Sequence, residues 1–212
     1  MKIKIMVLGM VRTNCYILND ETTKQAIVID PGDEGDKICA YMKENDLKLM
    51  GILLTHGHFD HITGLKDLKD TMPAKVYAAK AEQELLMNPQ WNCSESFGNF
   101  VTAQADQFLE DGQSIEIASM QIKVLATPGH TRGGVCYYFE KEKVLFSGDT
   151  LFFESIGRTD LPTGNGQIIL ESVAKKLMPL PDETQVYPGH GNHTSIGYER
   201  RNNPYVNGND WD

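Results

Sequence analysis

Short runs of hydrophobic residues alternate along the chain with segments that have helical spacing. Apolar or alternating runs predict strands at residues 3–8, 15–18, 26–29 and 51–54 in the N-terminal half. A second set of such runs, at residues 114–117, 121–125, 134–139, 143–146 and 185–187, predicts strands in the C-terminal half. Each half of the chain therefore contains enough strands for a sheet of its own.

Helical spacing occurs between these strands. The segment DEGDKICAYMKEND, residues 33–46, places Ile38 and Met42 four positions apart, and AKAEQELLMN, residues 79–88, is a second amphipathic segment. Further helices are predicted at residues 166–178 and within HITGLKDLKDTM, residues 61–72. The polar residues 88–106 have no clear period and predict a long loop at the rim of a site. This order favours an α/β (α+β) fold in one domain, residues 1–212, with two face-to-face sheets and outer helices.

The composition narrows the range of partners. The chain has 212 residues, 41% of them hydrophobic, and a formal net charge of −9, which gives little support for binding nucleic acid or an anionic membrane. The opening MKIKIMVLGM lacks the continuous apolar core of a secretory signal, so we expect a cytoplasmic protein. We expect its partner to be a small-molecule substrate. The four cysteines (Cys15, Cys39, Cys93 and Cys136) are far apart and lack a CxxC pair, which predicts free buried thiols.

All six histidines fall into three short segments. These segments are THGHFDH at residues 55–61, ATPGHT at 126–131 and YPGHGNHT at 187–194, and each begins where an apolar run stops. Asp149, in VLFSGDT, follows a fourth such run. Loops at strand ends commonly assemble sites from residues that are distant in the sequence. The clustering therefore predicts a single site at one edge of the sheets.

The spacing within these segments suits metal ligation. His56 and His58 are two positions apart, so an extended backbone directs both imidazoles to one side, toward one ion. Asp60 and His61 can turn toward a second ion as a helix begins. His130 can complete the first group, His190 can complete the second, and both oxygens of Asp149 allow it to bridge. Imidazole and carboxylate ligands are compatible with Zn²⁺, Fe and Mn²⁺.

The segment THGHFDH resembles the THxHxDH signature of the metallo-β-lactamase superfamily, and His130, Asp149 and His190 follow in the order of its remaining metal positions. The resemblance covers nearly the whole chain. It implies an αββα four-layer sandwich, in which two mixed β-sheets carry helices on their outer faces and the metals lie at one edge. The segments IDPG, GDTLF, GRTDLPTG and PGHG…IGYERRNNP are similar to glyoxalase II-like proteins, the hydroxyacylglutathione hydrolases, and especially to their short single-domain relatives.

The resemblance implies a role for each site residue. It implies two divalent ions, with Zn²⁺ the first choice and Fe or Mn²⁺ as alternatives. The first ion would be bound by His56, His58 and His130, the second by Asp60, His61 and His190, with Asp149 as the bridge. Asp60 and Asp149 are the predicted catalytic carboxylates, with Asp60 orienting the nucleophile.

Two further residues are predicted near the ligands. Arg158 occupies the position of a cation that contacts substrate in glyoxalase II, although an Arg158–Asp160 pair that holds the loop is an equal alternative. Asp30 is expected either to orient a ligand histidine through its other ring nitrogen or to form a strand-end turn. The helical glutathione-binding domain that follows in full-length glyoxalase II is not expected here.

These features predict a dinuclear metal-dependent hydrolase of a small ester-like bond. Two neighbouring ions lower the pKa of a shared water and supply metal-bound hydroxide at neutral pH. A thioester such as a hydroxyacyl-glutathione is the first-choice substrate, and a lactone is the second. Antibiotic hydrolysis is disfavoured, because true metallo-β-lactamases often carry Cys where this chain has Asp149. Resemblance to persulfide dioxygenases leaves a different class open, in which His56, His130 and Asp149 hold one Fe(II).

Overall fold

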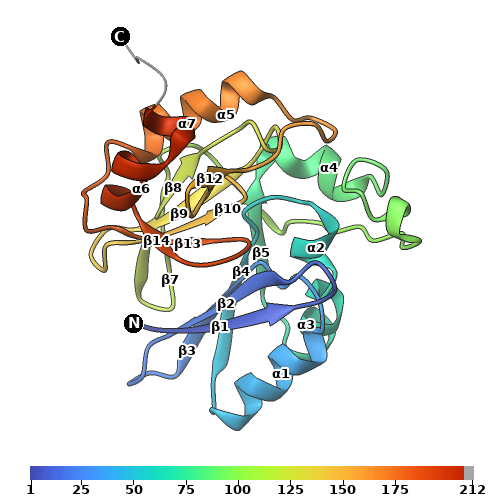
Figure 1. Cartoon of the computed structure of the whole chain (residues 1–212). Coiled ribbons are helices and arrows are strands. Elements are labelled where there is room, and N and C mark those ends of the chain that lie inside the picture. Colours follow the sequence, from blue (N-terminus) through green and yellow to red (C-terminus); the bar gives the residue numbers. More distant parts are fainter. Residues whose placement is uncertain (208–212) are drawn as a thin grey trace.

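Two six-stranded sheets form the centre of the molecule in a computed structural model that describes residues 1–207 (Figure 1). The first sheet has the order β1-β2-β3-β4-β5-β6, and the second has the order β14-β13-β10-β9-β8-β7. The strands of the first sheet are β1 (Lys2–Leu8), β2 (Thr13–Asn19), β3 (Gln25–Ile29), β4 (Lys48–Leu53), β5 (Lys75–Ala79) and β6 (Gln107–Leu109). Those of the second are β7 (Ser114–Ile117), β8 (Met120–Ala126), β9 (Val135–Phe139), β10 (Val144–Gly148), β13 (Gln185–Pro188) and β14 (Thr194–Ser195). A separate hairpin joins β11 (Leu151–Phe152) to β12 (Ser155–Ile156).

Both sheets are mixed, and the direction of their strands determines where the loops emerge. In the first sheet β3, β4, β5 and β6 run parallel, whereas β1, β2 and β3 pair antiparallel. In the second sheet β10 and β13 are parallel, and β8 points the same way because both β8 and β10 pair antiparallel with β9. The carboxyl ends of β8, β10 and β13 therefore lie along one edge of this sheet.

Helices cover the outer face of each sheet (Figure 1). On the N-terminal side they are α1 (Gly35–Glu44), α2 (Phe59–Ile62), α3 (Leu65–Thr71), η1 (Lys80–Glu82), α4 (Gln83–Met87) and η2 (Glu95–Phe97). On the C-terminal side they are α5 (Gly166–Ser172), η3 (Val173–Leu177), α6 (Ile196–Asn202) and α7 (Pro204–Asn207). Asn165 and Ser195 cap α5 and α6, because each side chain accepts a backbone N–H of the first turn.

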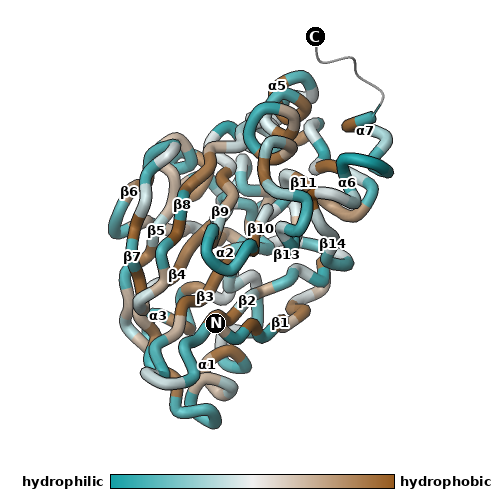
Figure 2. Tube along the Cα trace, turned by 90° about the vertical axis from the view of Figure 1, so that its left-hand side faces the viewer, coloured by the Kyte–Doolittle hydropathy of each residue, from teal (hydrophilic) through white to brown (hydrophobic). Residues whose placement is uncertain are grey.

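The alternation of side chains along the strands builds three buried layers. On β2, Tyr16 and Leu18 face the second sheet, while Ile17 faces α1 and α3. The layer between the sheets also contains Phe139 and Phe146, and a third layer packs the outer face of the second sheet against η3 and α6. Figure 2 shows hydrophobic segments concentrated on the central strands. The molecule is therefore a four-layer αββα sandwich.

This architecture confirms the predicted α/β (α+β) fold with two mixed sheets and outer helices. The strands and the helix at residues 166–178 lie close to their predicted positions, although β5, β6, β11, β12, β14, α6 and α7 were not predicted. Residues 88–106 form a loop that contains only the short η2. The last part of the predicted domain, residues 208–212, lies outside the described residues. Within residues 1–207, no helix has the length and apolar character needed to cross a bilayer.

The packing between the sheets gives the first testable prediction. Phe146 is fully buried, and its ring lies 4.9 Å from Tyr16 and 5.5 Å from Phe139. Phe146→Ala should lower the free energy of unfolding by about 3–5 kcal/mol, because it leaves a cavity between the sheets. Phe100→Ala is the control, since Phe100 is 74% exposed, and its effect should stay within about 0.5 kcal/mol. Equal destabilisation of the two variants in urea would contradict this account of the core.

Candidate metal centre

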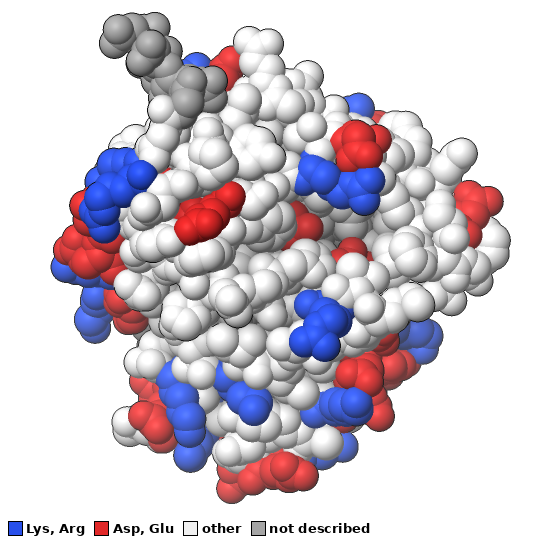
Figure 3. All heavy atoms as spheres, in the orientation of Figure 1, with Lys and Arg blue, Asp and Glu red and all other residues white. Residues whose placement is uncertain are grey.

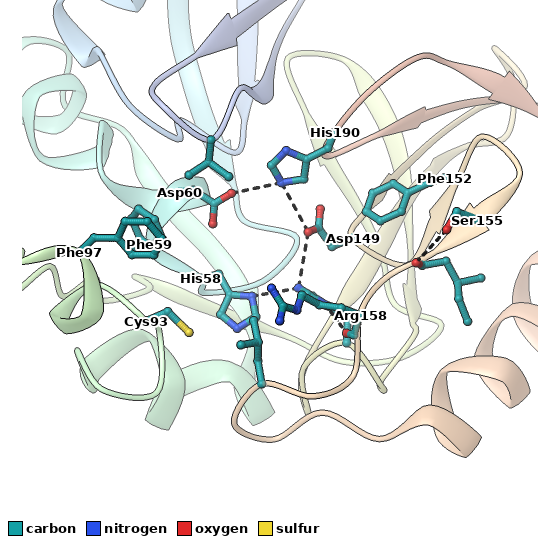
Figure 4. A pocket seen from close by; sticks show the side chains of 14 residues that line it. His58, Phe59, Asp60, Cys93, Phe97, Asp149, Phe152, Ser155, Arg158 and His190 are labelled. Atoms are coloured by element: carbon teal, nitrogen blue, oxygen red, sulfur yellow. Dashed lines mark hydrogen bonds and ion pairs between the residues drawn. The ribbon is translucent and has the colours of Figure 1, made fainter.

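Loops from both sheets converge at one edge of the sandwich. His56, His58, Asp60 and His61 follow β4, whereas His130 follows β8, Asp149 follows β10 and His190 follows β13. His56 and His190 are 134 positions apart in the sequence. They lie close together because the strands that precede them end at the same edge of the sandwich and the two sheets pack face to face. The structure brings together all seven predicted ligand residues, and Figure 4 labels four of them, His58, Asp60, Asp149 and His190.

The first group contains His56, His58 and His130. One ring nitrogen from each lies within 4.8 Å of the others, and all three residues are buried. His58 Nδ1 lies 2.9 Å from His130 Nε2. Burial lowers the pKa of His58 to about 3 and also holds the pKa of His56 far below its usual range, with neighbouring imidazoles adding to both effects. Neutral imidazoles with free lone pairs are the form that binds a metal ion.

The second group contains Asp60, His61 and His190, whose ligand atoms also lie within 4.8 Å of one another. Asp60 Oδ2 lies 3.2 Å from His190 Nε2 and 3.6 Å from His61 Nε2. Burial acts to raise the pKa of Asp60, but His61 and hydrogen bonds from His190 and Thr13 outweigh it and lower the pKa. The carboxylate therefore stays ionised at neutral pH and can act as a ligand.

Asp149 lies between the two groups. Its Oδ2 is 3.5 Å from His130 Nε2 and 3.5 Å from His190 Nε2, while its Oδ1 is 3.4 Å from His61 Nε2. The cluster of imidazoles lowers the pKa of Asp149 even though its burial acts in the opposite direction. One ionised carboxylate thus faces both groups, which is the placement that a bridging ligand requires.

These residues fit a pair of divalent ions. His56 Nε2, His61 Nε2 and Asp149 Oδ1 are buried and have no hydrogen-bond partner. A buried polar atom without a partner costs free energy, so several of them aimed at a common region indicate an absent charged group. The donor set of imidazoles and carboxylates suits Zn²⁺, Fe or Mn²⁺. That these seven residues bind metal stays a prediction.

Hydrogen bonds hold the ligand side chains in place. The buried Asp30 carboxylate accepts the Thr55 backbone N–H at 2.8 Å and the Thr55 hydroxyl at 2.6 Å, and its Oδ2 lies 2.9 Å from His61 Nδ1. This contact leaves His61 Nε2 to face the site. Thr13 donates its hydroxyl to Asp60 Oδ2 at 2.8 Å. Asp30 therefore contacts His61, one of the predicted ligands, and its role in orienting a metal ligand stays a prediction.

Glu82 is a buried carboxylate that the sequence interpretation missed. Its Oε1 accepts the Gly57 N–H at 3.0 Å and its Oε2 accepts the Gly133 N–H at 2.7 Å. Gly57 lies between His56 and His58, and Gly133 follows His130 in the neighbouring loop. Glu82 therefore ties together two loops that carry ligands. Its only sequence signal was an acidic residue between Ala81 and Gln83, on the predicted amphipathic helix at 79–88.

A cavity of about 450 Å³ opens beside the two groups, a size in the usual range for small-molecule sites. Besides ligand residues it is lined by Val11, Phe59, Cys93, Phe97, Phe152, Ser155, Ile156, Arg158 and Leu161. In Figure 3 a hollow on this face contains acidic atoms, with basic patches above and below it and an acidic patch to its left. All four cysteines are free, as the sequence predicted. Cys15, Cys39 and Cys136 are also buried as predicted, whereas Cys93 is only half-buried and lines the cavity.

Arg158 lines this cavity but already has a partner. Its Nε and Nη2 each lie 2.7 Å from the Asp160 carboxylate oxygens, and its backbone oxygen lies 2.8 Å from His130 Nδ1. The exposed Arg158–Asp160 pair is the alternative to substrate contact that the sequence left open, and a role for Arg158 in binding substrate stays a prediction. His193, in the same segment as His190, stacks on Tyr187 and is not in either group.

The model of the metallo-β-lactamase superfamily matches residues 8–190 of this chain. The chain belongs to this superfamily. At this level it is a metallo-hydrolase, and the cluster of His and Asp residues described above is its candidate metal site.

Two relatives cover nearly the whole chain. The probable metallo-hydrolase YqgX of Bacillus subtilis is 40% identical over 98% of this chain and 99% of its own. The hydroxyacylglutathione hydrolase GloC of Haemophilus influenzae is 34% identical, with the same coverage of 98% and 99%. These relatives confirm the predicted resemblance to glyoxalase II-like members of the metallo-β-lactamase superfamily.

Crystal structures of superfamily members have the same fold. The B3 metallo-β-lactamase BLEG-1 is 40% identical and superposes with a TM-score of 0.93, covering 97% of this chain and 100% of its own. TTHA1623 in a di-iron-bound form is 34% identical, with a TM-score of 0.85 and coverage of 95% and 99%. ETHE1 from Myxococcus xanthus is 32% identical, with a TM-score of 0.84 and coverage of 99% and 86%.

Substitution of one histidine from each group tests the metal centre. His58→Ala and His61→Ala should each reduce bound metal by about one ion per chain, because each removes one of few protein ligands. His193→Ala is the matched control, since its ring packs on Tyr187 outside both groups. Metal content is measured by elemental analysis, with circular dichroism as a check on folding. Full metal occupancy in both ligand variants would refute the dinuclear assignment.

Glu82 gives a second prediction for the site. In Glu82→Gln an amide NH₂ replaces one carboxylate oxygen and faces a backbone N–H, so one hydrogen bond is lost. The apo protein should lose about 1–3 kcal/mol of unfolding free energy, and its affinity for Zn²⁺ should fall about tenfold or more because the ligand loops lose their link. Glu84→Gln is the control on the adjoining helix α4, since the Glu84 side chain is 69% exposed. If the two variants behave alike, Glu82 does not hold the loops.

Proposed function

We propose that this protein is a dinuclear metal-dependent hydrolase of thioesters, with a hydroxyacyl-glutathione as the first substrate to test. The observation that carries the proposal is the pair of three-residue ligand groups with the Asp149 carboxylate between them. The relative named hydroxyacylglutathione hydrolase GloC supports the choice of substrate. Zn²⁺ is the first choice of metal, and the similarity to a di-iron protein keeps Fe as an alternative.

Two bound ions would supply a hydroxide nucleophile near neutral pH and would polarise the substrate carbonyl. The protein's contribution begins with Asp60, which borders the cavity and is held by Thr13 and His190. Because the pKa of Asp60 is lowered, its carboxylate is a weak base. We infer that Asp60 orients the nucleophile by accepting a hydrogen bond and does not remove its proton. A thiolate leaves without a strong acid, since thiol pKa values lie near 8.5.

A mononuclear Fe(II) dioxygenase is the competing function. Such an enzyme would use His56, His130 and Asp149 as its three ligands. This arrangement leaves His61 Nε2 buried without a hydrogen-bond partner and gives the group of Asp60, His61 and His190 no ion to bind. Two ions satisfy both groups, so the geometry favours the hydrolase over the dioxygenase.

Lactones and β-lactams test the boundaries of the proposal. A lactone has the same carbonyl chemistry as a thioester but a leaving group that stays attached. The similarity to the B3 metallo-β-lactamase BLEG-1 makes a β-lactam a necessary comparison. Antibiotic hydrolysis is still disfavoured, because this chain has Asp149 where true metallo-β-lactamases often carry Cys. Both substrates should be hydrolysed more slowly than a thioester.

The proposal is tested by metal analysis combined with a substrate panel. Protein purified without added metal, and protein loaded with Zn²⁺, Fe or Mn²⁺, is assayed with lactoylglutathione, a lactone, a β-lactam and glutathione persulfide. We expect about two ions per chain and thioester hydrolysis that is lost on chelation and restored by metal. One Fe per chain with O₂ uptake on the persulfide would establish the dioxygenase instead. Absence of thioester hydrolysis with both groups loaded would refute the proposed function.

A further inference from the structure

Apolar walls flank the predicted metal centre on two opposite sides. Phe59 and Phe97 form one wall, with ring centroids 4.5 Å apart. Phe152 and Ile156, from the β11–β12 hairpin, line the other side, and the Phe152 ring lies 6.3 Å from that of His190. Figure 4 shows Phe59 and Phe97 on one side of Asp60, Asp149 and His190, with Phe152 on the other. A scissile carbonyl at the metals would therefore have an apolar surface on both sides.

Part of this apolar surface is open to solvent. Phe97 is 50% exposed and Val11 is 38% exposed, although both line the cavity. Covering apolar surface is favourable by roughly 25 cal/mol per Å². A ligand with hydrocarbon groups therefore gains affinity here in a way that a hydrated, charged ligand does not.

The charges around the cavity give little support for a charged ligand. Among the described residues that line it, Arg158 is the one with a fixed positive charge, and Asp160 already binds its guanidinium through two contacts. Arg12 is next to Val11 in the sequence but does not line the cavity. A glutathione thioester has two carboxylates and one ammonium group, and these find no unpaired cation on the walls.

We infer that this site selects esters or thioesters whose groups on both sides of the scissile bond are uncharged and apolar. The inference rests on the proposed hydrolase function and names its substrate class. One hydrocarbon group packs on Phe59 and Phe97, and the other packs on Phe152 and Ile156. Glutathione thioesters are then hydrolysed through their carbonyl, with the charged tripeptide outside the apolar walls.

Four thioesters separate the contributions of the two sides. The acyl group is lactoyl or mandeloyl, which differ by a methyl or a phenyl group, and the thiol is glutathione or benzyl mercaptan. Each kcat/KM is divided by the rate of hydrolysis in hydroxide without protein, which corrects for differences in intrinsic reactivity. Each exchange, methyl to phenyl and glutathione to benzyl, should raise the corrected kcat/KM by about tenfold.

Variants of each wall connect these effects to the structure. Phe97→Ala should reduce the gain from one of the two exchanges to about twofold or less, and Phe152→Ala should do the same for the other exchange. The controls are Phe100→Ala and Phe153→Ala, because both side chains are exposed and neither lines the cavity. Phe153 is the sequence neighbour of Phe152 and stacks on Tyr198. Both controls should keep the parent gains.

The outcomes separate the inference from the function on which it rests. If none of the four thioesters is hydrolysed by the metal-loaded protein, the proposed function fails. If lactoylglutathione is hydrolysed but either exchange lowers kcat/KM or leaves it unchanged, only the inference of apolar selectivity is overturned. A preference for glutathione that disappears in Arg158→Ala or Arg12→Ala would show that a cation binds the tripeptide. Equal gains in wall and control variants would also overturn the inference.

Discussion

The structure depends on keeping a dense group of imidazoles and carboxylates away from water. His56, His58 and His61 are almost completely buried, and Asp149 has only 12% of its side chain exposed. Burial of ionisable groups is costly unless partners or a bound cation offset it. Neutral His56 and His58 avoid part of that cost, and the neighbouring imidazoles and hydrogen bonds that lower the pKa of Asp60 and Asp149 offset another part. The unpartnered atoms that remain define where a cation is needed.

The surrounding polar residues explain how such a group keeps its shape. Asp30 orders His61 and Thr55 at the ends of β3 and β4, which are adjacent and parallel. Glu82 joins a loop of the first sheet to a loop of the second. The ligand geometry is thus shared between the sheets and depends on their packing. Phe97 on η2 and the β11–β12 hairpin lie outside the ligand segments, so these parts of the apolar walls can change without altering the ligands, whereas Phe59 lies between His58 and Asp60.

The features that could be predicted from the sequence differ physically from those that could not. The three histidine segments were visible because each follows an apolar strand and because imidazoles at that spacing have few other uses. The fold followed from strands that are apolar on both faces. The strands β5 and β6 were missed because KVYAA and QFL are too short for a reliable period. Glu82 and Thr13 were missed because an acid on an amphipathic helix and a threonine at a strand start are common on solvent-facing surfaces.

The order of the ligand residues along the chain has a consequence for biosynthesis. His56 belongs to the first sheet, whereas His190 follows β13, close to the end of the described residues. During translation the first sheet can begin to fold while the second is still within the ribosome. The complete set of ligands cannot form until β13 has emerged and paired with β10. The group of Asp60, His61 and His190 is therefore completed only after the group of His56, His58 and His130, whose last member follows β8, so the two predicted ion sites arise one after the other as the chain emerges.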